Sequence, residues 1–309
     1  MLVVVAIPTF QRPAALRSAL DAVVPQAREA TGEDVSVRVL VVDNDAAASG
    51  RAVAESFAVA YVVEPTPGIA AVRNRAVEES SDADVVVFID DDEVPEESWL
   101  HNLLRAHAET GAHAVAGRVV TRFPDEVEPW VRSSGAFIRP TRADRQAMTE
   151  AATNNLLLDL RLIRPLGLRF DERFGLTGGS DSMYTRLLVA RGGTIRWAED
   201  AVVVEQEEAA RFNRAWVLMR TFRFGNTAAR VDIALAGSPW RRLAARVRMC
   251  LRGGARVCAG GARWAWGVLS RSLVHRARGL RTAYRGAGMI AAAVGYAHDE
   301  YGRRRKATA

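Results

Sequence analysis

The sequence predicts an α/β fold in which a mostly parallel central sheet is flanked by helices and followed by a helical C-terminal extension. Through residues 1–120, short β-branched runs alternate with longer helical patterns, which is the spacing of β-α-β units. The run Val85–Ile89 is apolar at every position, which favours a strand buried on both faces. The chain has 309 residues, 49% of them hydrophobic, and this is ample for a globular core.

The elements of the first half follow in order along the chain. Five strands are predicted, at Val3–Ile7, Val37–Asp43, Ala60–Val63, Val85–Asp90 and Ala112–Thr121. Four helices are predicted between them, near Pro13–Arg28, Ser49–Phe57, Gly68–Ser80 and Glu97–Thr110. The first apolar run has no basic segment before it and soon meets Pro8, which indicates a strand rather than a signal peptide.

The second half is less regular. Residues 122–150 contain three prolines and Gly135, so we predict a long irregular connection of the kind that often forms a lid or a binding wall. A helix that ends at Arg191 should follow, and then two short strands at Thr194–Trp197 and Ala201–Val204. Beyond Phe212 the pattern is helical, and no internal repeat is visible.

Polar residues follow four of the predicted strands at the point where each strand ends. The four segments are Pro8-Thr9-Phe10, Asp43-Asn44-Asp45, Glu64-Pro65 and Asp90-Asp91-Asp92. Ligands of open α/β sheets bind at the carboxyl ends of the strands. The convergence of these four segments therefore predicts a binding site at that edge of the sheet.

The acidic triplet Asp90-Asp91-Asp92 is the most informative of these segments. Three adjacent carboxylates repel one another unless a cation lies among them, and hard oxygen ligands suit Mg²⁺ or Mn²⁺. The alternative is that the acids only begin the next helix, where they favour the N-terminal dipole. The chain has neither G-x-G-x-x-G nor G-x-x-x-x-G-K-[ST], so neither a dinucleotide fold nor a P-loop ATPase is supported.

Several of these residues have chemistry that suits a nucleotide. Asp43 could accept a hydrogen bond from a uridine-like base or its sugar, and Arg73 could hold phosphate charge. A divalent ion at Asp92 could then stabilise a departing diphosphate.

At this point the chain resembles the inverting, GT-A-fold glycosyltransferases of family 2, whose fold is Rossmann-like. The resemblance is carried by Ile7-Pro8-Thr9-Phe10-Gln11-Arg12, Val41-Val42-Asp43-Asn44-Asp45, Gly68-Ile69-Ala70-Ala71-Val72-Arg73-Asn74, Phe88-Ile89-Asp90-Asp91-Asp92-Glu93 and Gly178-Gly179-Ser180-Asp181. These segments span residues 7 to 181 in the order and at the spacings of that family.

The resemblance implies a role for each matching residue. The residues implied to bind the donor are Pro8, Thr9, Phe10, Arg12, Asp43, Arg73, Asp90 and Asp91. Asp92 would be the principal ligand of Mg²⁺ or Mn²⁺, with Asp90 in support. Gly178, Gly179 and Ser180 would lie on the acceptor side, and Asp181 would be the general base that deprotonates the acceptor hydroxyl.

The chain departs from the family pattern at two positions. Ser180-Asp181 stands where the family usually has Glu-Asp; we keep Asp181 as the base, and the alternative is that it caps a helix at Met183–Ala190. Glu205 stands where many relatives have a histidine near the metal. Because it is followed by Gln206 and further acids, we favour a solvated loop residue at this position.

Charge is distributed unevenly along the chain. Residues 1–210 carry 21 arginines and 33 acidic residues, a net charge of −12, whereas residues 211–309 carry 21 basic and three acidic residues, a net charge of +18. A basic tail on an acidic body suggests an anionic partner for the tail. Nucleic acid is not expected, since the acidic body would repel a polyanion.

Six residues of the tail follow the spacing of one helical stripe. They are Trp266, Leu269, Leu273, Ala277, Leu280 and Tyr284, and arginines lie on the adjacent flank. Two interpretations stay open: residues 237–309 contact an anionic membrane, or the stripe packs against the body or forms a homodimer interface. The two cysteines, Cys250 and Cys258, are not in C-x-x-C spacing and support neither zinc nor a disulfide framework.

Together these features imply a metal-dependent inverting transfer of a sugar from a nucleotide-sugar, expected to be a UDP-sugar, to a hydroxyl of a lipid-linked or polysaccharide acceptor. The alternatives are a soluble natural-product acceptor and a non-catalytic nucleotide- or nucleic-acid-binding module. Residues 1–120 would bind the donor, 121–232 the acceptor, and 233–309 would form the basic tail. We expect a cytoplasmic protein without a membrane span, peripheral on the cytoplasmic face of the membrane if the tail binds lipid.

Overall fold

A computed structural model describes residues 1–206 and 208–298 of the protein. The chain divides into two compact units. Unit 1 consists of Met1–Arg122, Arg139–Gly175 and Ser180–Gln206, and unit 2 of Phe123–Ile138, Leu176–Gly179 and the chain from position 207 onward. The functional division predicted at residues 120 and 232 stays a prediction.

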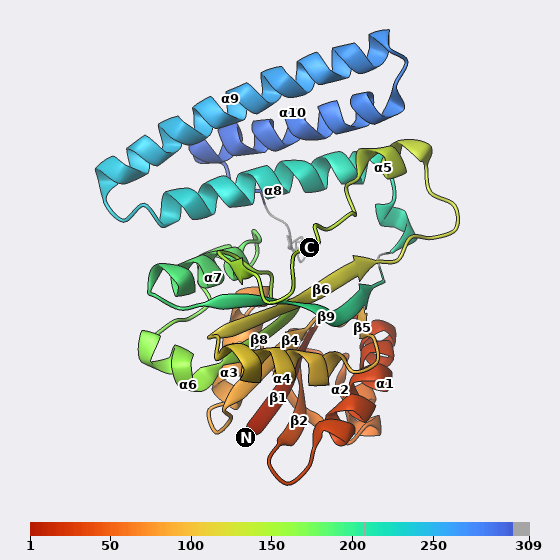
Figure 1. Ribbon diagram of the computed structural model, residues 1–309, viewed down its shortest axis with the longest axis vertical. Helices are drawn as coiled ribbons and strands as arrows, with labels where there is room; N and C mark the ends of the chain where they lie inside the picture. Colours follow the sequence, from red (N-terminus) through yellow and green to blue (C-terminus); the bar gives the residue numbers. More distant parts are fainter. Residues whose placement is uncertain (207, 299–309) are drawn as a thin grey trace, which may run out of the picture. The chain divides into compact units, whose positions relative to one another are not determined.

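Unit 1 is an α/β unit built on one mixed sheet (Figure 1). Its strands are β1 (Leu2–Thr9), β2 (Ser36–Asp43), β3 (Ala60–Val63), β4 (Val85–Ile89), β5 (Glu93–Pro95), β6 (Ala114–Thr121), β7 (Ala147–Met148), β8 (Asn155–Asp159) and β9 (Ile195–Glu205). Its helices are α1 (Pro13–Ala30), α2 (Arg51–Ser56), α3 (Ile69–Glu79), α4 (Trp99–Thr110), α6 (Leu160–Ile163) and α7 (Ser180–Ala190), with short 3₁₀ turns at Arg164–Leu166 and Glu172–Phe174.

The strand order is β3-β2-β1-β4-β8-β6-β9-β5, and β7 pairs with β9. The first four strands are parallel, as the β-α-β pattern predicted, and β6 and β9 are also parallel. The remaining pairs are antiparallel, because β8 returns beside β4 after a long connection. The predicted α/β fold with a central sheet is confirmed, and parallel pairing is concentrated in its N-terminal half.

Residues of β1 alternate between the two faces of the sheet, as the period of a strand requires. Val3, Val5 and Ile7 pack in a core with α1, α2 and α4, whereas Val4 and Ala6 pack in a second core with α3, α6 and α7. Both faces of the sheet are therefore covered, which explains the continuous apolar runs of β1 and β4.

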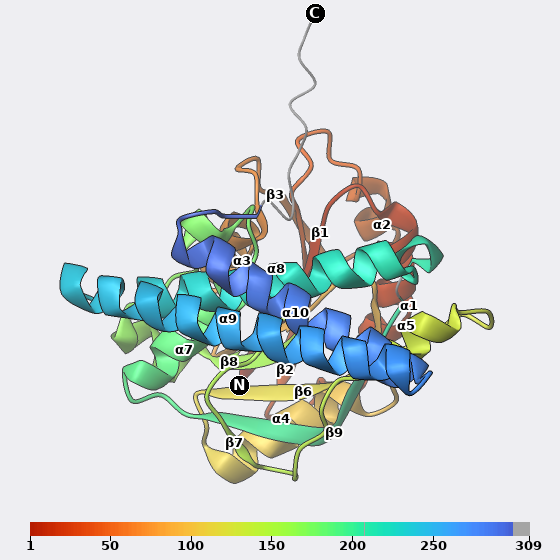
Figure 2. The same ribbon diagram turned by 90° about the horizontal axis from the view of Figure 1, so that it is seen from above.

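Unit 2 is helical. It contains α5 (Pro129–Ser134), a 3₁₀ turn at Ala209–Arg211, α8 (Arg214–Ala234), α9 (Pro239–Leu269) and α10 (Leu273–Ala293). Figures 1 and 2 both show α9 and α10 side by side along most of their length. One core joins Val131 and Phe137 to Val217 on α8 and Ala277 on α10.

Glycines bring α9 and α10 into close contact. Gly253, Gly260 and Gly267, one every seventh residue of α9, are buried. A Cβ atom placed on Gly260 would lie only 2.5 Å from the backbone nitrogen of Ala283, and one on Gly253 would lie 2.7 Å from the carbonyl oxygen of Gly286. The backbones therefore approach more closely than side chains would permit, and this fixes which face of α9 meets α10.

Three local predictions need correction. The single stripe from Trp266 to Tyr284 is wrong, because α9 ends at Leu269 and α10 begins at Leu273. Arg271 in the turn has a φ of 53°, a left-handed conformation that no helix continues.

The two short strands predicted between positions 194 and 204 form one strand, β9. Its pairing with β6 shifts register between Gly117 and Arg118, and this irregularity accommodates the polar interruption that suggested two strands. The connection 122–150 is not wholly irregular, because it contains α5 and β7. Within residues 1–206 and 208–298, no helix is long and apolar enough to cross a bilayer.

Candidate active site

The predicted strand-end residues gather in unit 1 around a hydrogen bond between β1 and the acidic triplet. The Oγ1 atom of Thr9 donates to Oδ2 of Asp91 at 2.7 Å, and both side chains are buried. Pro8 lies one residue earlier in β1, opposite Val42 of β2. Parallel pairing of β1 with β2 and β4 thus brings segments that are 82 residues apart to one edge of the sheet, as predicted.

Arg12 is the nearest cation to the acidic triplet among the contacts that the described residues make. Its Nη1 atom lies 2.8 Å from Oδ2 of Asp92 and 3.5 Å from Oδ1 of Asp91. Two of the three carboxylates therefore share one guanidinium group. The resemblance had assigned Arg12 to the donor, whereas in this structure it neutralises part of the triplet's charge.

Carboxyl groups at this edge are crowded and poorly solvated. Burial raises the pKa of Asp90 to about 7, with repulsion from Asp92 and Asp91 adding to it, while the charge of Arg73 opposes the rise. Burial likewise raises the pKa of Asp91 to about 6. The pKa of Glu93 is held well above its usual value, again chiefly by burial. Burial and mutual repulsion therefore disfavour the ionised forms of these carboxyl groups, and a nearby positive charge would favour them.

Glu205 belongs to this cluster, and the prediction of a solvated loop acid was wrong. It is the last residue of β9, where it pairs with Glu93 of β5. Its carboxylate accepts from Arg139 Nη2 at 2.8 and 2.9 Å and from Thr121 Oγ1 at 2.9 Å. Pairing of β9 with β5 and β6 brings a residue from an acidic run into a half-buried position beside Arg139 and Thr121. Sequence reasoning missed Arg139 altogether.

Asp43, at the end of β2, is buried and already well supplied with donors. Its Oδ2 atom accepts from the backbone N–H of Gly50 at 2.7 Å and from the hydroxyl of Tyr61 at 2.8 Å. Its Oδ1 atom accepts from the N–H of Asp45 at 2.9 Å. A carboxylate offers about four acceptor positions, so roughly one remains for a ligand. Tyr61 lies on β3 and was not predicted to belong to the site.

Arg73, on α3, contacts the first residue of α7. Its Nη1 atom donates to Oγ of Ser180 at 2.8 Å, and its guanidinium lies 5.8 Å from the ring centroid of Phe170. Its Nε atom is buried without a hydrogen-bond partner among the described residues. Buried unpaired donors are costly, so this N–H is well placed for a ligand oxygen.

Asp181 lies in the first turn of α7, which begins at Ser180. The alternative that it caps a helix starting at Met183 is therefore wrong, because the helix already includes it. Its Oδ1 atom accepts from the N–H of Ser182 at 2.8 Å. The preceding Gly178 and Gly179 have φ values of 73° and 96°, a region that glycine enters without strain.

The oxygens of the triplet are chemically suited to Mg²⁺ or Mn²⁺, since carboxylates are the hard ligands that both ions prefer. The raised pKa values of Asp90 and Asp91 are consistent with such a site, because a bound cation would favour the ionised forms of both carboxyl groups. In the part of the chain that the structure describes, no three acidic, histidine or cysteine side chains are already arranged around a common point. Asp92 is half-buried and paired with Arg12, and its side chain is more exposed than that of Asp91.

The sequence was compared with known proteins. Residues 4–163 match the family model for glycosyl transferase family 2. The succinoglycan biosynthesis protein ExoM of Rhizobium meliloti (strain 1021) is 34% identical over 244 residues, which is 72% of this chain and 78% of that protein. The glycosyltransferase AglE of Haloferax volcanii is 26% identical over 204 residues, or 64% of either chain.

Solved structures give a likeness of fold. The crystal structure of S. aureus TarS 1–349 matches with a TM-score of 0.52 and 11% identity, over 90% of this chain and 89% of that one. The same TarS segment in complex with UDP matches with a TM-score of 0.51 and 12% identity, over 92% of this chain and 90% of that one. At such identities the likeness concerns the path of the backbone alone.

Proposed function

The chain belongs to glycosyl transferase family 2 and is a glycosyltransferase, and from this premise we propose that it transfers a sugar from a UDP-sugar to a hydroxyl of a polysaccharide or lipid-linked acceptor. The observation that carries the proposal is the buried hydrogen bond from Thr9 to Asp91. It brings the donor-side end of β1 against the acidic triplet at the ligand-binding edge of the sheet. The TarS segment, which shares this fold, has been solved with UDP.

The nucleotide would lie along β1, β2 and α3. The remaining acceptor position of Asp43 suits the N–H of a pyrimidine base, and the unpaired Nε of Arg73 suits a phosphate oxygen. Thr9 and Arg12 hold Asp91 and Asp92 in place, so that their carboxylate oxygens would be preorganised to bind a divalent ion beside the departing diphosphate.

Proton removal from the acceptor would fall to Asp181. Its Oδ1 atom is held by the N–H of Ser182, so the carboxylate has one fixed orientation and a second oxygen for a substrate hydroxyl. A positioned carboxylate that accepts this proton raises the nucleophilicity of the oxygen that attacks the anomeric carbon. In-line attack would invert the configuration at that carbon.

A divalent ion is part of this proposal, with Asp92 as its principal ligand and Asp90 in support. When bound, Mg²⁺ or Mn²⁺ would offset the negative charge that develops on the diphosphate. Asp92→Asn should weaken the binding of Mn²⁺ measured in the presence of UDP at least tenfold, because an amide is a poorer hard ligand. Thr121→Ala, at the Glu205 end of the cluster, serves as the control. Equal Mn²⁺ affinity in wild type and Asp92→Asn would refute the assignment.

The acceptor is the least constrained part of the reaction. The name of ExoM refers to succinoglycan biosynthesis, and the basic C-terminal region suits a substrate at a negatively charged membrane surface. A soluble natural-product acceptor is the second candidate. Family membership disfavours the third, a non-catalytic nucleotide- or nucleic-acid-binding module.

A donor panel tests the proposal directly. Purified protein would be incubated with Mn²⁺ and each of a set of UDP- and GDP-sugars, and release of the free nucleoside diphosphate would be measured with and without membrane extract. We expect one UDP-sugar to be consumed, and faster with extract. Release only from a GDP-sugar would overturn the choice of nucleotide, and faster turnover with a soluble hydroxyl compound would favour the second acceptor.

A further inference from the structure

Helix α9 presents a row of apolar side chains that are left exposed by the described residues of unit 2. The row consists of Trp240, Leu243, Ala244, Val247 and Leu251, and we call it the α9 stripe. Trp240 is 79% exposed and Leu251 69%. The five residues line an open groove of about 660 Å³ together with Arg248 and Arg252. Exposed apolar patches of this kind usually mark an interaction surface.

The stripe cannot turn inward, because the opposite face of α9 is already fixed. Ala245, Met249 and Gly253 are buried on that face, and the glycine contacts to α10 leave no space for another side chain. Rotating α9 to bury Leu251 would bring Cβ atoms against the backbone of α10. The exposure of the stripe therefore follows from how the two helices pack.

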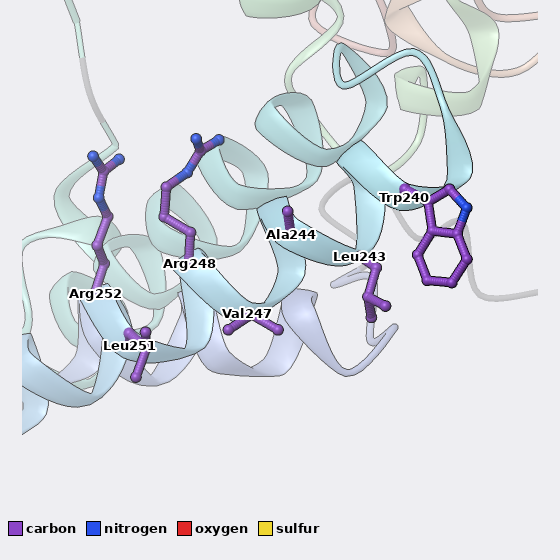
Figure 3. Close-up of a pocket in the computed structure, with 7 residues that line it drawn as sticks. All are labelled: Trp240, Leu243, Ala244, Val247, Arg248, Leu251 and Arg252. Carbon is purple, nitrogen blue, oxygen red and sulfur yellow. The ribbon is translucent and has the colours of Figure 1, made fainter.

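The charged residues of α9 itself are all positive. The 31 residues of α9 include seven arginines and no acidic residue. Arg248 and Arg252 line the same groove as Leu243, Val247 and Leu251, and Figure 3 shows the two arginines pointing away from these three side chains, along the flank of the stripe. Arg252 also lines a second cavity, of about 450 Å³, together with Arg256, Arg285 and a single acid, Asp232.

We propose that the α9 stripe docks on an anionic lipid bilayer, with its apolar side chains in the interface and the flanking arginines at lipid phosphates. A Trp- and Leu-bearing face beside an Arg-rich flank is the pattern of a helix that lies in the membrane plane. The cavity at Arg252, Arg256 and Arg285 suits a lipid phosphate. α9 is ~46 Å long at 1.5 Å per residue, which is long enough to lie across several headgroups.

The arginines of α9 favour an anionic membrane, rather than a second copy of this chain, as the partner of the α9 stripe. Two α9 helices docked stripe to stripe would place arginines against arginines with no acid on either helix to offset them. An anionic surface attracts each arginine instead, by about 1 kcal/mol, a roughly fivefold gain in affinity. The proposal goes beyond the proposed function, because binding to lipid needs neither donor nor acceptor.

Vesicle flotation of the full-length protein tests the proposal. The probes are phosphatidylcholine vesicles with and without phosphatidylglycerol, at low and high salt. We expect binding only to the anionic vesicles, and release as salt rises, because exposed charges are screened. Leu251→Glu should weaken binding about tenfold or more, since it removes a buried apolar contact and adds a repelled charge. The matched control is Ile138→Glu, at a residue that is 68% exposed and belongs to the same unit but not to α9.

A second variant, Arg248→Gln/Arg252→Gln, keeps the stripe and removes two charges. It should weaken binding about fivefold for each arginine and reduce the salt dependence. The proposal is overturned if Leu251→Glu, folded by circular dichroism, binds anionic vesicles like the wild type. It is also overturned if the protein ignores vesicles and sediments as a dimer that Leu251→Glu dissociates. Sugar transfer to a soluble acceptor is measured in a separate assay. A protein that transfers no sugar but binds anionic vesicles would contradict the proposed function and not the proposal of membrane binding.

Discussion

Asp181 uses one carboxylate oxygen to accept the N–H of Ser182, and this separates its two conceivable roles. A general base must lose activity on neutralisation, while a structural residue must lose stability. Asp181→Asn should therefore keep the affinity for UDP and lower the rate of transfer by about 10²-fold or more. Calorimetric titration with UDP and steady-state assays check the two halves of this expectation. Ser182→Ala, one residue on, is the control, and a normal rate in Asp181→Asn would move the base elsewhere.

Arg139 is expected to stabilise the acid cluster. It holds Glu205 through two hydrogen bonds, and Glu93 and Asp90 lie close enough for their charges to act on its guanidinium. Arg139→Gln should lower the free energy of unfolding by about 1.5–3 kcal/mol, the range for charged hydrogen bonds. Urea unfolding measures the loss, and Glu205→Gln in the same chain should restore part of it.

The exposed pair Arg38–Asp82 provides a matched comparison. Breaking it with Arg38→Gln should cost about 1 kcal/mol or less, as for other surface ion pairs. If the two arginines proved equally dispensable, Arg139 would have no special part in holding Glu205.

For individual residues, the sequence predicts which positions belong to the candidate site better than it predicts their hydrogen-bond partners. Thr9, Asp43 and Asp90 were predictable because each directly ends or follows an apolar strand. The partners were not, because contacts such as Arg73 with Ser180 join residues 107 positions apart. Tyr61 had a usable signal: β2 and β3 are consecutive parallel strands, so a side chain near the end of β3 lies beside Asp43.

Among the elements, the pair α9 and α10 depends on its glycines. A Cβ at Gly260 would lie 2.5 Å from the nitrogen of Ala283, whereas one at Gly261 would meet nothing within 4 Å. Gly260→Ala should therefore force the helices apart and destabilise unit 2 by about 1–3 kcal/mol. Gly261→Ala should instead stabilise it by about 0.5–1 kcal/mol, because alanine favours a helix.

Thermal or urea unfolding of both variants checks the expectation. The free energy of unfolding should fall in Gly260→Ala and rise in Gly261→Ala. Two losses of equal size would show that α9 and α10 are held by something other than close backbone contact.

Helices and strands with strong periodicity were predicted closely, and boundaries without glycine or proline were not. β3 begins and ends at the predicted residues, and α1 differs only at its C-terminus. The turn between α9 and α10 escaped notice because Ser270-Arg271-Ser272 contains no usual helix breaker. Its signal was Ser272, whose side chain accepts from the N–H of His275 as an N-cap.

For the molecule as a whole, unit 2 is assembled from three separate stretches of chain. Its core joins Val131 and Phe137 to Ala277, with Leu280 packed beside them. A chain cut at Gly237 should therefore leave these apolar side chains without cover and be poorly soluble. Sedimentation of the truncated and intact proteins after expression measures this, and a soluble, monomeric truncation would show that α9 and α10 are dispensable for the core.

The contrast in charge between the acidic N-terminal part and the basic C-terminal part was visible in the sequence. Which apolar helix face accompanies the basic residues on the surface was not. The apolar stripe was predicted at Trp266–Tyr284, and the half beyond the turn is partly core, with Ala277 fully buried. A helical pattern shows which residues share a face, and it does not show which face a partner covers.

The acid cluster cannot form during synthesis until β9 has paired with β5. Glu93 meets Glu205 only when the last residues of β9 have joined the sheet. A ribosome must therefore release more than two hundred residues before these acids meet, and until then β6 has an open edge where β9 will bind. Between the synthesis of β6 and that of β9, the nascent chain therefore carries a sheet with an unpaired edge that could pair with another chain.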